Sequence, residues 1–332
     1  MHKIKQLPED FIVKEINEIK LGDNGDYSYF LLKKKNYNTL RAIESIVNKL
    51  NINEKNIGFS GNKDKNAITE QVISIHKGSK KIENIAIKDI ELKYLGNGNE
   101  KIYLGNLKGN KFEITIRNLT KKDIGKISNK EILMPNYFGP QRFSKNNHQI
   151  GKAIVKKNFK KAINLILETN SDYNEKIKQH LQKKPNDFVV ALKMIPFKLL
   201  KLYVHAYQSY LFNKALEQYI RDNKLKINDK KNNYNTKLPI VGFGTEIKNN
   251  NIDKIIKKIL KKENIGFRDF IIRQIPELSS EGDERNTFIT VKDFKIINQD
   301  KDELNNIKEK LIVSFSLPKG CYATVFIDYL FT

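Results

Sequence analysis

Alternating apolar and polar residues predict a sheet in the first part of the chain. The runs DFIVKEI (10–16) and YSYFLLKKK (27–35) are typical of strands and are separated by turn formers. Over 39–50, apolar residues instead recur every three or four positions, which predicts an amphipathic helix. We expect this helix to pack on the sheet that the two strands begin.

A polar loop lies between two further predicted strands. IGFSG (57–61) is predicted as a short buried strand, and TEQVISIH (69–76) alternates again, so Asp64 lies on the loop between them. Loops are accessible while strands fix their ends, and functional carboxylates are often held in this way. Farther along, KFEITIRN (111–118) is predicted as another half-buried strand.

The middle of the chain has a different pattern. MPNYFGPQRF (134–143) holds two prolines, a glycine and three aromatic residues, so it can be neither a helix nor a central strand. From about 147 to roughly 285 helical periodicity dominates, apart from a strand-like interruption at 238–244. The stretch 311–330 is again β-rich, with a turn inside it.

These patterns together predict an α+β chain with an insertion. The simplest arrangement is a core of residues 1–146 and 286–332, completed by the last strand, with a mainly helical unit of residues 147–285 between its two parts.

The composition of the chain indicates what kind of partner it binds. The 332 residues have a formal net charge of +23, which opposes compaction and suits a polyanion, so a nucleic acid is favoured over an untargeted basic surface. The 61 basic residues include only seven arginines, and the Lys, Asn and Ile bias resembles the codon usage of an A/T-rich genome. Part of the net charge can therefore come from the base composition of the genome and not from selection for a partner.

The scarcity of cysteine and histidine and of long apolar runs excludes other classes of protein. The single Cys321 excludes a disulfide framework and a thiolate metal cluster, and the five histidines show no ligand spacing, so we expect no metal. The N-terminal residues lack an apolar signal core, and no run reaches about 18 apolar residues. We expect a cytoplasmic chain that does not contact a membrane.

The stretch GFSGNKDKNAITEQ (58–71) carries the first candidate for chemistry. Lys63 and Lys65 flank Asp64 and favour its charged form, which suits a nucleophile or a general base. Composition alone favours a simpler interpretation, a surface turn in a lysine-rich protein. The buried strand before the loop and the alternating strand after it favour a functional carboxylate.

NYFGPQRF (136–143) carries the second candidate. An exposed loop dense in aromatic residues must bury them or present them to a ligand, and stacking on a splayed base contributes roughly 1 to 3 kcal/mol. Arg142 is a scarce arginine, which suggests that a forked donor is needed there. An aromatic staple with a structural arginine explains the loop equally well. Phe11 and Tyr322, both at turns, are more often plain core residues.

Six blocks of the sequence, taken in order, closely resemble the tRNA pseudouridine synthase D (TruD) family. They cover the chain from residue 8 to 324, and chance would have to reproduce both their wording and their order. The blocks are PEDFIVKE (8–15), GFSGNKDKNAITEQ (58–71), LGNLKGNKFEITIRN (104–118), NYFGPQRF (136–143), AYQSYLFN (206–213) and LPKGCYAT (317–324).

The resemblance implies a pseudouridine synthase that isomerises a uridine in RNA without a metal or a cofactor. The family's usual target is uridine 13 of tRNA, although some members modify other RNAs, so the RNA and the uridine stay open here. The implied fold is a synthase core with a mixed, largely antiparallel sheet flanked by helices. A mainly helical TRUD domain, matching 147–285, is inserted into it. A monomer is the default expectation.

The resemblance also implies residue roles. Asp64 matches the catalytic aspartate of the family's G-x-K-D-x-x-A-x-T-x-Q block, and Phe138 matches a residue that stacks in the pocket. Tyr322 stands where phenylalanine is common, and its added hydroxyl needs a partner if it is buried. The expected substrate-binding residues are Lys5, Phe11, Lys63, Asn136, Phe138, Arg142 and Tyr322.

The implied reaction breaks the C1′–N1 bond of uridine, rotates the base and joins C1′ to C5. Because a stacked base hides C1′, the nucleotide must first be flipped out, at a cost of a few kcal/mol. Asp64 then either attacks C1′ or removes a sugar proton to give a glycal, and both routes remain open. The alternatives are a catalytically silent RNA-binding protein on this fold and a glycosylase, which would release free uracil.

Overall fold

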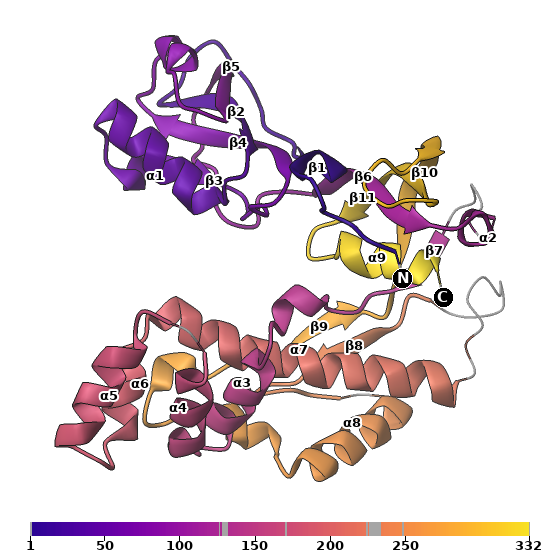
Figure 1. Cartoon of the computed structure of the whole chain (residues 1–332). Helices are drawn as coiled ribbons and strands as arrows, with labels where there is room; N and C mark the ends of the chain where they lie inside the picture. Colours follow the sequence, from indigo (N-terminus) through magenta and orange to yellow (C-terminus); the bar gives the residue numbers. More distant parts are fainter. Residues whose placement is uncertain are drawn as a thin grey trace. The chain divides into compact units, whose positions relative to one another are not determined.

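The computed structural model describes residues 2–125, 127, 132–169, 171–223, 225, 234–247 and 249–331. The chain forms two compact units (Figure 1), one of Met1–Ile132 with Thr290–Thr332 and one of Leu133–Ile289. We call them the sheet unit and the helical unit. The chain leaves the sheet unit within β7 (Ile132–Pro135) and returns to it within β10 (Phe288–Lys301).

The sheet unit is built on one mixed, largely antiparallel sheet. From β5 to β10 its strand order is β5-β2-β4-β1-β6-β11-β10; β7 lies at the edge beyond β10, and β3 also pairs with β4. β1 and β4 are parallel, whereas the other neighbours along this order are antiparallel. The predicted fold class is therefore confirmed. The strands are β1 (Phe11–Ile16), β2 (Tyr27–Lys35), β3 (Ile57–Phe59), β4 (Ile68–His76), β5 (Ile90–Gly98), β6 (Gly109–Leu119), β10 (Phe288–Lys301) and β11 (Glu309–Pro318).

A strand from the C-terminal part of the chain completes the sheet that the N-terminal part begins. β11 pairs antiparallel with β6 between the registers Glu309–Leu119 and Pro318–Gly109. In Figure 1 the yellow β11 accordingly lies beside the magenta β6. The rings of Phe112 and Phe315 stack across this pair with centroids 5.3 Å apart. The expectation that a late strand completes the core is confirmed.

The helix predicted over 39–50 has those bounds in the structure, as α1 (Thr39–Leu50). Asn38 caps it, since its side chain accepts a hydrogen bond from the backbone N–H of Arg41. Its apolar stripe packs on the inward residues of β2 and β4, which include Phe30 and Ile73. The periodicity was a sufficient signal because this helix has a single buried face.

The β-rich prediction for 311–330 is confirmed up to Pro318 and wrong after the turn. β11 ends at Pro318, the chain turns at Gly320, whose φ of 77° suits glycine, and α9 (Ala323–Leu330) follows. Valine, phenylalanine, isoleucine and tyrosine in this stretch favour a strand by propensity. Burial decides otherwise, because Ala323, Phe326 and Ile327 lie on one face at helical spacing and are buried.

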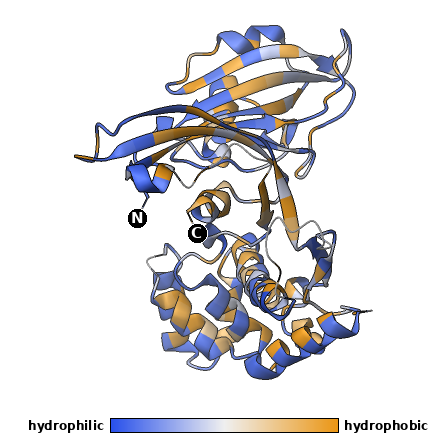
Figure 2. Cartoon of the chain, turned by 90° about the vertical axis from the view of Figure 1, so that its right-hand side faces the viewer, coloured by the Kyte–Doolittle hydropathy of each residue, from blue (hydrophilic) through white to orange (hydrophobic). Residues whose placement is uncertain are grey.

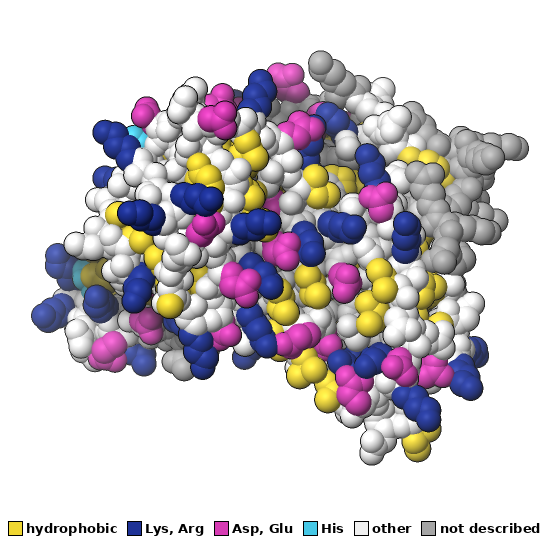
Figure 3. Space-filling view, turned by 90° about the horizontal axis from the view of Figure 1, so that it is seen from above, with side chains coloured by type: hydrophobic (Ala, Val, Ile, Leu, Met, Phe, Trp, Pro, Cys, Tyr) yellow, Lys and Arg dark blue, Asp and Glu magenta, His cyan; other side chains and the backbone are white. Residues whose placement is uncertain are grey.

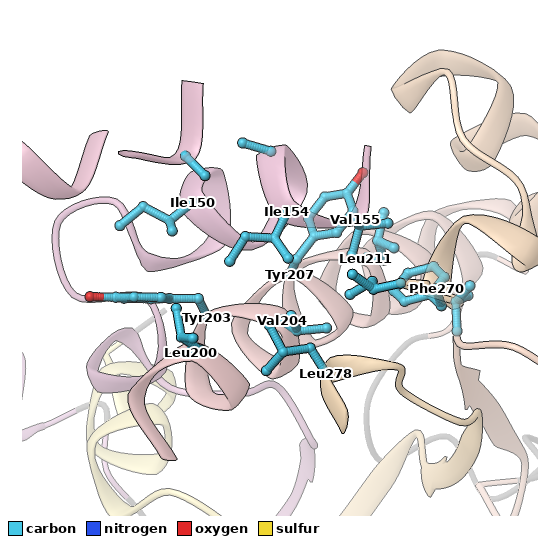
Figure 4. Close-up of a cluster of buried hydrophobic side chains, with 14 of the residues drawn as sticks. Ile150, Ile154, Val155, Leu200, Tyr203, Val204, Tyr207, Leu211, Phe270 and Leu278 are labelled. Atoms are coloured by element: carbon cyan, nitrogen blue, oxygen red, sulfur yellow. The ribbon is translucent and has the colours of Figure 1, made fainter. Parts of the chain in front are cut away.

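The helical unit is organised around one long helix, α7 (Phe197–Asp222). α7 is buried on several sides: Figure 4 shows its Tyr207 and Leu211 among apolar side chains of the same core cluster. Helix α3 approaches so closely that a Cβ at Gly151 would lie 1.9 Å from the backbone oxygen of Tyr203. Figure 2 shows apolar and polar faces on the helices of this unit. Its other elements are α3 (Asn147–Val155), α4 (Phe159–Leu167), α5 (Asn174–Lys183), α6 (Phe188–Lys193), α8 (Asn250–Glu263), β8 (Lys237–Ile240) and β9 (Asp283–Asn286).

In the aromatic segment 134–143, the first two residues end the edge strand β7, and the rest is irregular except for a single 3₁₀ turn, Pro140–Arg142. Residues 147–285 all belong to the helical unit, and their assignment as an inserted domain stays a prediction. Within the described ranges, each helix is too short or too polar to cross a membrane.

Candidate active site

The Asp64 turn joins β3 to β4 in the sheet unit, as the sequence predicted. The side chain of Asp64 is 38% exposed, and its Oδ2 accepts a hydrogen bond from Lys5 Nζ at 2.5 Å. Lys5 Nζ also lies 4.0 Å from the centroid of the Phe11 ring. The structure therefore brings three of the predicted site residues together, with an ammonium group between a carboxylate and an aromatic ring.

The backbone near the N-terminus explains how Lys5 reaches this position. Lys3 exchanges two backbone hydrogen bonds with Arg117 of β6, at 2.9 and 2.8 Å, which fixes the segment against the sheet. Lys5 then adopts φ of 59°, in the left-handed region that is uncommon for residues other than glycine. Such a conformation persists where surrounding contacts enforce it, and here the contacts are those to Asp64 and Phe11.

Lys63, next to Asp64 in sequence, is directed elsewhere. Its Nζ lies 2.6 Å from Glu15 Oε2 on β1, and the two side chains are 6% and 1% exposed. The cation that contacts the Asp64 carboxylate is thus Lys5, 59 positions away, in place of the flanking lysine. The substrate-binding role predicted for Lys63 stays a prediction.

Phe11 is held by a buried ion cluster beside it. The neighbouring Asp10 forms a salt bridge of 2.8 Å with Arg117, which also contacts Asp302 at 3.0 Å and Glu303 at 3.1 Å. Hydrogen bonds from Arg117 and then Lys310 lower the pKa of Glu303 to about 2. The Phe11 ring is buried and packs edge-on against Phe112. Both the start of β1 and this ring are therefore fixed by tertiary contacts.

Tyr322 also belongs to the sheet unit. It occupies the N-cap position of α9, directly after the turn that ends β11, and it is half-buried. Its predicted contact with the substrate base stays a prediction.

The helical unit gathers the remaining predicted residues around Arg285. The Asn136 side chain is buried; its Nδ2 donates to the backbone oxygen of Asn286 at 3.0 Å, and its Oδ1 accepts from Arg285 Nη2 at 2.6 Å. The guanidinium carbon of Arg285 lies 4.2 Å from the centroid of the Phe138 ring. The amide and the ring thus share one arginine, which fixes the orientation of the amide.

Helix α7 holds the backbone of the aromatic loop. Phe138 N–H donates to Asn213 Oδ1 and Asn213 Nδ2 donates to the Phe138 oxygen, both at 2.9 Å. The Phe138 ring packs edge-on against Phe212 at 5.4 Å. Arg142 lies 6.0 Å from the same ring, and its Nε donates to Ser209 Oγ at 3.3 Å. Blocks 136–143 and 206–213, separate in sequence, therefore meet in this unit.

Two residues at these sites were missed by the sequence analysis. Arg285 is as scarce a residue as Arg142, and that scarcity was its available signal. Lys34 is 1% exposed, and its Nζ donates to the backbone oxygen of Asp64 at 3.2 Å. Burial lowers the pKa of Lys34 to about 8, with the charge of Asp64 opposing and that of Lys63 reinforcing the shift. The alternation of Phe30, Leu32 and Lys34 in β2 placed it on the inward face.

A carboxylate that accepts a hydrogen bond from an ammonium group on a braced turn can act as a nucleophile or as a base. No group of three or more His, Cys, Asp or Glu residues that could hold a metal ion occurs in the part of the chain that the structure describes.

Comparison with known proteins gives a consistent result along the whole chain. A family model described as tRNA pseudouridine synthase D (TruD) matches residues 2–179, 167–230 and 220–328. A protein of Aquifex aeolicus named tRNA pseudouridine synthase D is 31% identical over 386 residues, which cover 99% of this chain and 98% of that protein. A Methanosarcina acetivorans protein named "Probable tRNA pseudouridine synthase D" is 32% identical, with 97% and 90% of the two chains covered. A crystal structure of a protein assigned as TruD from Methanosarcina mazei superposes with a TM-score of 0.74, at 28% identity, and covers 99% of this chain and 93% of that one.

Proposed function

Because the chain belongs to the tRNA pseudouridine synthase D (TruD) family, we propose that Asp64 is the carboxylate that reacts with the target uridine. The family's activity is the isomerisation of uridine to pseudouridine in tRNA, so the chain is an isomerase that acts on tRNA. The observation that carries the assignment of Asp64 is its 2.5 Å contact with Lys5 Nζ, which itself lies over the Phe11 ring.

In this mechanism Asp64 supplies a negatively charged oxygen at C1′ of a uridine that has been flipped out of its stack. Attack on C1′ would give a glycosyl ester, and removal of a sugar proton would give a glycal. Both routes break the C1′–N1 bond and need the same charged oxygen. Lys5 serves either route, since its charge-assisted hydrogen bond stabilises and orients the carboxylate.

The flipped base is received, in this proposal, by the aromatic and amide residues. Phe138 stacks on uracil, and Asn136, whose amide already binds Arg285 and the backbone of Asn286, lies at the uracil edge together with these partners. Phe11 and Tyr322 line the base. Lys63 contributes by holding β1, on which Phe11 lies, through Glu15, and Arg142 contributes by holding the Phe138 loop to α7 through Ser209. This role is supported by the contacts of Arg285, which donates a hydrogen bond to the Asn136 amide and lies over the Phe138 ring. A monomer supplies all of these residues.

The RNA is attracted by the overall charge of the chain. The formal net charge is +23, and on the face in Figure 3 the basic side chains are scattered among acidic ones instead of gathered in one patch. Many weak phosphate contacts therefore supply the affinity, and they also offset the cost of flipping the base.

The test is product analysis with purified protein and a tRNA transcript. The wild-type protein should form pseudouridine without releasing uracil, and Asp64→Ala should form none while binding the transcript within about a few-fold of wild type. Released uracil would identify a glycosylase. Pseudouridine formation by Asp64→Ala would contradict the assignment of the carboxylate.

A further inference from the structure

Lys34, near the end of β2, and Thr39, the first residue of α1, hold the backbone on both sides of Asp64. Thr39 Oγ1 accepts a hydrogen bond from the backbone N–H of Lys63 at 2.9 Å. Lys34 Nζ donates to the backbone oxygen of Asp64 at 3.2 Å and to that of Tyr37. The peptide group between Asn62 and Lys63 and the one between Asp64 and Lys65 are thus each held by a buried side chain.

Both side chains are buried, and neither is needed there for packing alone. Thr39 is 0% exposed and begins α1, but Asn38 supplies the helix cap, which leaves the Thr39 hydroxyl to the turn. Burial of an ammonium group is opposed by the loss of its hydration. Methionine or leucine would fill the volume of Lys34 without that cost. Its charge is therefore useful chiefly for the two backbone oxygens that it binds.

A second layer of side chains holds the same turn from other strands. Gln71 of β4 accepts from Thr39 Oγ1 at 2.9 Å and donates to the backbone oxygen of Gly61 at 3.0 Å. Glu15 of β1 accepts from Ser60 Oγ at 2.5 Å. The turn is thus attached to β1, β2, α1 and β4 by polar contacts, and such directional contacts fix its position more narrowly than apolar packing does.

We propose that Lys34 and Thr39 are positioning residues that set the place of the Asp64 carboxylate for the reaction. This inference rests on the proposed role of Asp64. A carboxylate that moves by about 1 Å can lose about a hundredfold in rate, whereas tRNA affinity comes from phosphate contacts elsewhere. Loss of either residue should therefore lower kcat and leave KM and RNA affinity nearly unchanged.

Thr39 offers a matched pair of variants. Thr39→Val keeps the shape and removes the hydroxyl, whereas Thr39→Ser keeps the hydroxyl and removes a methyl group. We expect kcat to fall about 10-fold to 100-fold in the valine variant and about 2-fold or less in the serine variant, with KM within about 3-fold in both. Rates are measured well below the melting temperature of each variant, where circular dichroism shows both to be folded.

Lys34 is tested against its neighbour in the same strand. Lys34→Met and Lys33→Met remove the same charge from β2, but the Lys33 side chain is 45% exposed and pairs with Glu91 at the surface. We expect kcat to fall about 100-fold for Lys34→Met and to stay within about 2-fold for Lys33→Met. The double variant of Lys34→Met and Thr39→Val should lose little more than the worse single variant, because both hold the same turn. If Lys34→Met does not fold, the Thr39 pair still decides.

The two proposals fail in different ways. An active Asp64→Ala would overturn the role of Asp64 and this inference with it. An inactive Asp64→Ala together with wild-type kcat in Thr39→Val would overturn this inference alone. Equal losses in Thr39→Val and Thr39→Ser, or a loss confined to KM, would also contradict it, because a positioning hydroxyl predicts neither.

Discussion

The Asp64 turn of the sheet unit and the Phe138 loop of the helical unit are held in different ways. Around Asp64 the contacts join full charges, Lys5 to Asp64 and Lys63 to Glu15. Around Phe138 they join a ring and an amide to Arg285. The first arrangement depends strongly on distance and direction, since charge-assisted hydrogen bonds weaken quickly when misaligned. The second tolerates rotation, since stacking depends on area.

This difference teaches which step each region serves. A bond-breaking step needs a charged atom in one place, which suits the Asp64 turn. Capture of a base that arrives in many orientations suits a ring that is held but not enclosed. Variants of the first region should therefore act on the chemical rate, and variants of the second on how often a base is captured.

The largest expected effect is a difference in the free energy of unfolding between variants of two arginines, Arg117 in the sheet unit and Arg285 in the helical unit. Arg117→Met leaves the buried carboxylates of Asp10 and Asp302 without their cation, and should lower the free energy of unfolding by about 3 kcal/mol. Arg285→Met leaves a ring and two uncharged oxygens of Asn136 without their donor, and should cost less, about 1 to 2 kcal/mol. Urea denaturation of both variants measures the difference. Equal losses would mean that the helical unit also depends on a buried ion cluster.

The next effect concerns Lys5. Lys5→Met removes the ammonium group from Asp64 and should lower kcat by about a hundredfold, with tRNA affinity within about 3-fold. Lys5→Arg, which keeps the charge, should recover part of the rate. Single-turnover kinetics with saturating enzyme measures this. A methionine variant with the wild-type rate would remove Lys5 from the account of the site.

Phe138 gives a smaller effect of another kind. Phe138→Ala loses the ring that we propose stacks on uracil, worth about 1 to 3 kcal/mol, so turnover should fall about 10-fold to 100-fold. Phe138→Tyr should keep most of it. Whole-tRNA binding should change less than turnover, since phosphates dominate it. Parallel turnover and filter-binding assays decide, and equal losses in both would instead indicate a general packing role.

The smallest effect is a pH dependence from Lys34. Its pKa is about 8 in the folded chain and about 10.4 when unfolded. Between these pH values Lys34 is protonated in the unfolded chain and largely deprotonated in the folded one, so the free energy of unfolding rises with pH. Below about pH 8 the contribution of Lys34 does not change with pH. From pH 8 to 9.5 the wild type should gain on the order of 1 kcal/mol relative to Lys34→Met. Denaturation curves at several pH values test this, and parallel curves would contradict it.

Periodicity predicted the parts of the fold that have one buried face. The helix at 39–50 and the strands around Asp64 follow from local pattern, because alternation and helical spacing report burial directly. The C-terminal helix was missed because its residues favour strands by propensity and its burial is set by the rest of the fold. Distant packing therefore limited the prediction.

The same limit applied to the site. The resemblance named Lys5, but no spacing shows that it, and not Lys63, contacts Asp64, since that contact spans 59 positions. Lys34 could have been suspected from the alternation in β2, yet its partners could not. Arg285 lies 149 positions from Asn136. Sequence can indicate which side chains are unusual, whereas the fold decides which of them meet.

The role of Asp64 is tested most directly by the single-turnover rate of Asp64→Asn with a tRNA substrate and saturating enzyme. This variant keeps the shape of the side chain and removes its charge, so we expect no pseudouridine above background, with RNA affinity within about 3-fold of wild type. Conversion by the asparagine variant at a tenth of the wild-type rate or faster would show that the reaction does not need this charged oxygen.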